Sequence, residues 1–227
     1  MDISDIDLSF FLGKSVGFFD PTMNGGKTRA LVKELDRASR SGSNVIAYNS
    51  AKNSRESNSI VINGEFPFPA KTVKDIAELR ADLEDRIKFN AANQTPLGER
   101  GEKVIFHDIP HQRGYPLNVV GIDEANLFTL NPQEAEEMLD FVGWCRDNSL
   151  ALFMAGLTHD FRHRDFGYIH TILPYVDIKI SQKPVCMAIV DKDETKCNRT
   201  AKHTQRVWSA QFTREQKLQS YLASEAA

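Results

Sequence analysis

The sequence predicts an α/β domain with a parallel central sheet, and three features support this prediction. Short apolar runs at 16–19 and 44–48 are typical of buried strands, and between them apolar residues recur at helical spacing over 28–41. Strand, turn, helix and strand in this order form one βαβ unit, whose strands lie parallel with a right-handed crossover. Further apolar runs at 119–122 and 150–155 are expected to add buried strands to the same sheet.

The segment between the two halves of this sheet is more polar. An apolar triplet at 60–62 predicts a strand, whereas Phe-Pro-Phe-Pro at 66–69 predicts a turn or an extended link, because proline is excluded from central strands. Apolar residues at helical spacing predict an amphipathic helix from 72 to about 89. A loop at 93–102 and a strand at 104–106 are expected to follow.

The second half contains one helix with clear terminal signals. Asn131 is a typical N-cap residue, Pro132 suits the first helical position and Glu134 is a carboxylate in the first turn, so a helix is expected from here to about 146. Alternating apolar residues over 177–190 favour antiparallel or edge strands over another βαβ unit. The first thirteen residues predict only an acidic lead-in.

Composition and charge exclude several classes of protein. The 227 residues include 28 Lys and Arg and 31 Asp and Glu, a net charge of −3, whereas a duplex nucleic-acid binder normally carries a basic excess. No apolar run approaches the roughly 20 residues that span a bilayer. Cys145, Cys186 and Cys197 are too scattered for a disulfide framework, and the acidic N-terminus does not suit a secretion signal, so a cytoplasmic location is expected.

A glycine-rich loop at 21–28 separates the first predicted strand from the first predicted helix. It ends in Gly-Lys-Thr, as phosphate-binding loops do, although Pro21 stands where their first glycine belongs. Lys27 would reach the terminal phosphates and the Thr28 hydroxyl would bind Mg²⁺. The backbone N–H groups expected to face the phosphates are those of Asn24, Gly25, Gly26, Lys27 and Thr28. The alternative is a plain glycine-rich turn with a lysine on the helix surface.

Two consecutive acids follow the apolar strand at 119–122. Because ligands of open parallel sheets bind outside the carboxyl ends of the strands, Asp123 would hold Mg²⁺ and Glu124 would accept a proton from an attacking hydroxyl or water. The alternative is a polar strand end with solvated carboxylates. The hypothesis requires Lys27 to lie close to both acids in the folded chain.

Four segments, in order, resemble the type II thymidine kinases, a family of small P-loop deoxynucleoside kinases. The loop at 21–28 keeps the family's Met, Gly, Lys and Thr in register, with Pro-Thr in place of Gly-Pro. The segment at 120–128 is similar to the family's Ile-Gly-Ile-Asp-Glu-Ala/Gly-Gln-Phe-Phe motif. The segments at 156–167 and 197–206 are similar to its Asp-Phe-Arg and Tyr-Thr-x-Arg motifs.

The resemblance implies an organisation for the whole chain. It predicts a RecA-like P-loop α/β domain with a parallel central sheet over 14–180, and a small β-rich lasso appendage over 181–212 that covers the nucleoside site. A C-terminal helix or tail would occupy 213–227. Since the family commonly forms tetramers, a homo-oligomer is expected. Neither nucleic acid nor a membrane is an expected partner.

The resemblance also implies a reaction, the transfer of the ATP γ-phosphoryl group to the 5′-hydroxyl of thymidine or a related deoxyuridine, modified ones included. Glu124 would be the base and Arg162 would neutralise charge on the transferring group, while Lys27, Thr28 and Asp123 would hold ATP and Mg²⁺. The residues expected around the nucleoside are Met23, Phe128, Leu157, Phe161 and His203. Core packing is the alternative role for Met23, Leu157 and Phe161.

The chain departs from the family at several positions. The family holds its covering loop with a four-ligand zinc site, but here Cys186, Cys197 and His203 would supply three ligands, so no structural zinc is expected. Asn126 replaces a glutamine beside the base. Two other functions therefore stay open, a P-loop ATPase or motor and a non-catalytic nucleotide-binding relative. The preferred base and the effect of Pro21 on the loop are not determined by the sequence.

Overall fold

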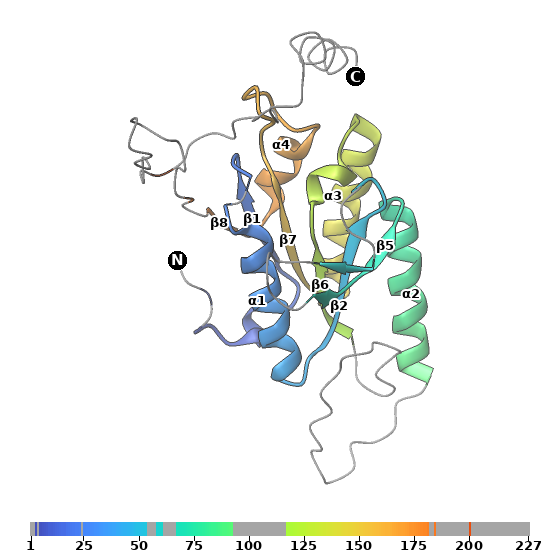
Figure 1. Ribbon diagram of the computed structural model, residues 1–227. Helices are drawn as coiled ribbons and strands as arrows, with labels where there is room; N and C mark the ends of the chain where they lie inside the picture. Colours follow the sequence, from blue (N-terminus) through green and yellow to red (C-terminus); the bar gives the residue numbers. More distant parts are fainter. Residues whose placement is uncertain are drawn as a thin grey trace.

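The computed structural model describes residues 3, 5–23, 25–53, 58–60, 67–92, 117–181, 184 and 200. Its centre is a six-stranded parallel sheet in the order β5-β2-β6-β7-β1-β8 (Figure 1). The strands are β1 (Ser15–Asp20), β2 (Asn44–Ser50), β5 (Lys71–Val73), β6 (Leu117–Ile122), β7 (Ala151–Leu157) and β8 (Ile178–Ile180). The predicted α/β fold with a parallel central sheet is confirmed.

Helices cover both faces of this sheet. The α-helices are α1 (Lys27–Arg40), α2 (Ile76–Ala92), α3 (Pro132–Asp147) and α4 (Ile169–Ile172), and the 3₁₀ turns are η1 (Leu8–Phe11), η2 (Ala125–Phe128) and η3 (Leu173–Tyr175). Helix α1 packs on one face together with the N-terminal residues Ile3 and Phe11. Helices α2, α3 and α4 pack on the other (Figure 1). The acidic lead-in thus contributes to the core.

Each central strand contributes to both cores. In β7, Leu152 and Met154 belong to the core under α2 and α3, while Phe153 and Ala155 belong to the core under α1. Alternate side chains of a strand point to opposite faces, so a strand covered on both faces must be apolar throughout. This is why the continuous apolar runs, rather than alternating ones, identified the central strands.

The predicted start of α3 is confirmed, whereas the predicted start of α2 is wrong. Asn131 caps α3 as predicted, with Oδ1 accepting from the Glu134 N–H at 2.9 Å. The expected helix start at 72 is wrong, because Lys71–Val73 forms β5 and α2 begins at Ile76. There Asp75 Oδ1 accepts from the Glu78 N–H at 2.8 Å, a local cap that fixes the later start.

The strand predictions outside the centre have mixed outcomes. Of 60–62, only Ile60 is described, in the two-residue β3 (Ser59–Ile60), which pairs antiparallel with β4 (Phe68–Pro69) in a separate small sheet. Strand β8 is an edge strand as expected, but it runs parallel to β1, so the antiparallel alternative is wrong for this part of 177–190. The predictions for 93–102, 104–106 and 213–227 lie outside the described residues, as does nearly all of the appendage at 181–212.

Candidate active site

The loops that follow β1, β6 and β7 lie at one edge of the sheet, because these neighbouring strands are parallel and end on the same side. Ligands of open parallel sheets bind at such an edge. The loops contain the predicted phosphate loop, then Asp123 with Glu124, and then Phe161 with Arg162. The fold therefore brings three of the four motif segments to one place.

Thr28 and Asp123 are in direct contact although they are 95 positions apart in the chain. The Thr28 Oγ1 hydroxyl lies 3.1 Å from Asp123 Oδ1 and 3.2 Å from Oδ2, within hydrogen-bond range of both. Asp123 is 4% exposed, at the end of β6. A hydroxyl beside a carboxylate supplies the oxygen ligands that Mg²⁺ prefers, so this pair fits a magnesium site.

The Lys27 ammonium lies in a strongly acidic environment. Burial lowers the pKa of Lys27, and the carboxylates of Asp20, Glu124 and Asp123 act in the opposite direction without restoring the ordinary value. The side chain donates a hydrogen bond to the Thr22 carbonyl. The charges of Asp123 and Glu124 thus act on Lys27, and the next residue, Thr28, contacts Asp123 directly.

The start of α1 presents backbone N–H groups to the same place. Gly26, the residue before the helix, has φ of 83° and no side chain with which to cap it. A left-handed backbone of this kind favours glycine. Because glycine has no side chain to cap the helix, the N–H groups at the helix start can instead donate to a bound anion. Gly25 and Gly26 therefore lie where phosphates are expected. The remaining predicted member of this loop, Asn24, lies outside the described residues.

Glu124 has an unusual backbone conformation. Its φ of 49° and ψ of 45° are left-handed, and it directly precedes η2. Such a conformation is costly for a residue other than glycine and is held only where the surroundings determine it, often at functional sites. Glu124 therefore begins the turn into η2, whereas Asp123 directly follows β6.

The loop after β7 forms a tight hairpin organised by Asp160. Asp160 Oδ1 accepts from the Arg162 N–H at 2.7 Å and from the Arg164 N–H at 3.0 Å. Burial acts to raise the pKa of Asp160, but the hydrogen bonds from Arg164 and Arg162 outweigh it and lower that pKa. The guanidinium carbon of Arg162 lies 5.2 Å from the centre of the Phe161 ring. The hairpin thus presents a cation and an aromatic ring together.

The residues expected around the nucleoside differ in exposure. Met23 is 37% exposed and Phe161 is half-buried, whereas Leu157 is 8% and Phe128 1% exposed. Phe128 packs in the core under α2 and α3. Met23 and Phe161 are thus the side chains of this group that a ligand can reach in the structure. His203 lies outside the described residues.

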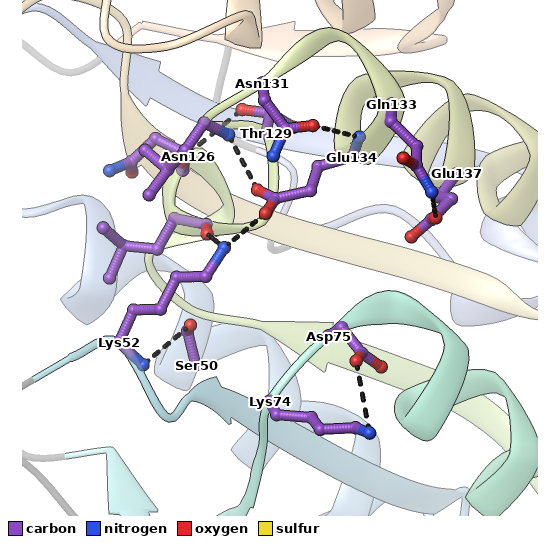
Figure 2. A network of polar contacts seen from close by, with 12 residues as sticks. Ser50, Lys52, Lys74, Asp75, Asn126, Thr129, Asn131, Gln133, Glu134 and Glu137 are labelled. Atoms are coloured by element: carbon purple, nitrogen blue, oxygen red, sulfur yellow. Dashed lines mark hydrogen bonds and ion pairs between the residues drawn. The ribbon is translucent and has the colours of Figure 1, made fainter. Parts of the chain in front are cut away.

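A lysine that the sequence analysis did not single out connects β2 to the turn beside the site (Figure 2). Lys52 Nζ donates to the Leu127 carbonyl at 3.1 Å and to Glu134 Oε1 at 2.8 Å. Glu134 Oε2 in turn accepts from the Leu130 N–H at 3.0 Å. This network holds the second half of η2 and the residues that follow it, and η2 itself begins directly after Glu124. Its only sequence signal, a lysine just after a strand, is too common to have identified it.

Asn126 joins the ends of β6 and β7. It is 1% exposed, and its Oδ1 accepts from the Leu157 N–H at 2.8 Å. A Cβ added to Gly156 would lie only 2.8 Å from the same oxygen, so the close approach requires glycine there. The residue that replaces the family's glutamine therefore holds together the two loops that contain Glu124 and Arg162.

A metal site could also consist of several His, Cys, Asp or Glu side chains. Among the described residues, no group of three or more such side chains is arranged to hold a metal ion. Cys186, Cys197 and His203, the three zinc ligands considered, are not among the described residues. No helix described here is long and apolar enough to cross a membrane.

The sheet, the loop at the start of α1 and the acids at the end of β6 define a nucleotide-binding protein of the P-loop class. A family model described as thymidine kinase matches residues 84–219, more than half of the 227-residue chain. The match begins within α2, after the phosphate loop. The chain belongs to the thymidine kinase family and is a thymidine kinase-like phosphotransferase.

Two individual proteins are also similar to the chain. The thymidine kinase of Mesoplasma florum is 26% identical over 186 residues, which cover 82% of this chain and 72% of that protein. The cytoplasmic domain of the type VII secretion ATPase EccC of Thermomonospora curvata aligns with a TM-score of 0.41 and 10% identity, over 91% of this chain. The chain spans only 22% of that structure, and a TM-score this low adds nothing on function.

Proposed function

We propose that the protein transfers the γ-phosphoryl group of ATP to the 5′-hydroxyl of a pyrimidine deoxynucleoside, thymidine or a related deoxyuridine. The observation that carries this proposal is the contact between Thr28 and Asp123, with Lys27 beside them. This contact joins the glycine-rich loop to the end of β6, and it supports a single site for a nucleoside triphosphate. The family match supports a nucleoside as the acceptor.

Each residue of the phosphate site has a distinct part in this proposal. The Gly25 and Gly26 N–H groups and Lys27 bind the phosphates, while Thr28 and Asp123 hold Mg²⁺. Mg²⁺, when bound, offsets the negative charge of the phosphates. The Lys27 ammonium has three N–H donors, so it can keep the Thr22 carbonyl as an acceptor while it donates to a phosphate oxygen.

Glu124 serves as the general base. Its carboxylate lies near Lys27 but, unlike Asp123, it belongs to the turn into η2. It accepts the proton of the attacking 5′-hydroxyl. Arg162, on the hairpin after β7, offsets the charge that the transferring group carries in the transition state. Met23 and Phe161 contact the base of the nucleoside, whose flat ring suits aromatic stacking.

The test is a phosphoryl-transfer assay with ATP, Mg²⁺ and a panel of thymidine, deoxyuridine, modified deoxyuridines and deoxycytidine. The Glu124→Gln variant is expected to lose about 10²–10⁴-fold in kcat while keeping its affinity for ATP. Glu136→Gln, at an exposed position of α3, is the matched control and is expected to behave as wild type. ATP binding without transfer to any nucleoside would contradict the proposal, as would full activity of Glu124→Gln.

A further inference from the structure

We propose that Asp20 is a positioning residue for ATP, because it builds the turn that replaces the glycine turn of the phosphate loop. This inference rests on the proposed function, since it assigns Lys27 to the phosphates. The family's Gly-Pro is Pro21-Thr22 in this chain, and proline cannot adopt the positive φ that glycine allows. Another interaction must therefore set the conformation of the loop.

The carboxylate of Asp20 provides this interaction. It is the last residue of β1 and is 4% exposed. Its Oδ1 accepts a hydrogen bond from the Thr22 N–H at 2.9 Å and a second one from the Thr22 hydroxyl. An aspartate that accepts from the N–H two residues later forms an Asx turn, and proline suits its middle position because φ is already set there. Pro21 thus fits this turn.

The turn determines where Lys27 lies. Thr22 is 2% exposed, and its carbonyl accepts from Lys27 Nζ. Gly25 packs against the turn, since an added Cβ would lie 3.1 Å from Thr22 Oγ1 and 3.6 Å from Asp20 Oδ1. Asp20 therefore acts on the phosphate loop through Thr22.

Asp20 also ties this loop to the nucleoside side of the site. Its backbone carbonyl accepts from the Thr158 N–H at 3.2 Å, at the start of the hairpin that contains Arg162. The effect proposed here comes from the hydrogen-bonded turn, and not from the charge of the carboxylate. Asparagine preserves the acceptor oxygen without the charge, so Asp20→Asn separates the two contributions.

The experiment measures the Kd for MgATP without nucleoside, and the KM values in the transfer assay. Asp20→Ala is expected to raise Kd and KM for ATP by about tenfold or more, with the nucleoside KM within about threefold of wild type. Asp20→Asn is expected to restore ATP affinity to within about threefold of wild type. Thr22→Val, which keeps the N–H but lacks the hydroxyl, should fall between them. Asp36→Asn, on the partly exposed surface of α1, is the control.

Several outcomes would overturn the inference. Wild-type ATP affinity in Asp20→Ala would do so, and so would equal losses in Asp20→Ala and Asp20→Asn, which would make the charge responsible. If Asp20→Ala does not fold, Asp20→Asn and Thr22→Val decide together. A Kd for ATP raised about tenfold or more in Asp20→Asn would refute the turn, and an unchanged Kd in Thr22→Val would show that the Thr22 hydroxyl adds nothing to it. A wild-type protein that binds ATP but transfers nothing would contradict the proposed function and leave the Kd comparison intact.

Discussion

Two clusters of polar side chains differ in how their charges are balanced. The first lies at the carboxyl ends of β1 and β6, and the second lies between α2 and the strands β2 and β5. The phosphate-loop cluster consists of Asp20, Lys27, Asp123 and Glu124, in which three carboxylates act on one ammonium. The Asp82 cluster consists of Asp82 and its three donors, Tyr48, Lys71 and Arg86. The first has more negative than positive charge, whereas the second has donors for both oxygens of its single carboxylate.

The donors of the Asp82 cluster come from two strands and one helix. Asp82 Oδ2 accepts from the Tyr48 hydroxyl at 2.6 Å and from Arg86 Nε at 2.8 Å, and Oδ1 accepts from Lys71 Nζ at 2.7 Å. The Tyr48 pKa is raised far above its usual value, first by burial and then by Asp82. Such a cluster stabilises α2 against the sheet. The phosphate-loop cluster, with three carboxylates and one ammonium, instead has a net negative charge that favours a bound Mg²⁺.

The largest expected effect concerns the phosphate-loop cluster. Asp123→Asn should lower kcat/KM by about 10²–10³-fold, because the ligand to Mg²⁺ is weakened. The free energy of unfolding should change little or rise, since one of the like charges around Lys27 is removed. Steady-state kinetics and urea unfolding check the two parts. A large loss of stability would show that this cluster is structural after all.

The converse substitution tests the Asp82 cluster. Asp82→Ala leaves the Tyr48 hydroxyl and the Arg86 guanidinium without their acceptor, so the free energy of unfolding should fall by about 1–3 kcal/mol. The kcat should stay within about twofold of wild type, because the side chains of Asp82, Tyr48 and Arg86 lie on the side of the sheet covered by α2, whereas the phosphate loop leads into α1 on the other side. Urea unfolding beside the transfer assay measures both quantities. Lost activity in a stably folded Asp82→Ala protein would remove the distinction between the clusters.

The pH dependence of stability sharpens the comparison. Burial acts to raise the pKa of Asp82, but hydrogen bonds from Lys71, Tyr48 and Arg86 outweigh it, so the folded-state pKa lies below the ordinary value. The stabilisation is complete above the unfolded-state pKa and is lost as pH falls through the folded-state pKa. Between neutral and acidic pH, wild type should lose more free energy of unfolding than Asp82→Asn. If the free energy of unfolding fell equally with pH in the two proteins, the lowered pKa of Asp82 would be contradicted.

The smallest expected effect is that of Tyr48→Phe. The ring is fully buried and remains so, while one of the three donors to Asp82 is lost. The free energy of unfolding should fall by about 1 kcal/mol, the usual worth of one hydrogen bond. Thermal and urea unfolding measure this change, and transfer activity should not respond. A loss well above that of Asp82→Ala would place the role of Tyr48 in packing rather than in the cluster.

The accuracy of the sequence predictions followed the range of the interactions involved. The N-cap at Asn131 was predicted because capping acts within a few residues. Strand β5 was missed because Lys71–Val73 becomes a strand by pairing with Tyr48–Ser50, which lies more than twenty positions earlier.

The amino-acid sequence by itself determined the order of strands and helices, and it determined that polar loops with Lys27, Asp123 and Glu124 follow apolar strands. It could do so because periodicity and end signals are properties of neighbouring residues. Only the tertiary structure decided which charges share a cluster, and so that the charges of three carboxylates act on the single ammonium of Lys27. The reason is that hydrogen bonds and Coulomb forces depend on distance in space, and packing of the sheet sets that distance between residues such as Thr28 and Asp123.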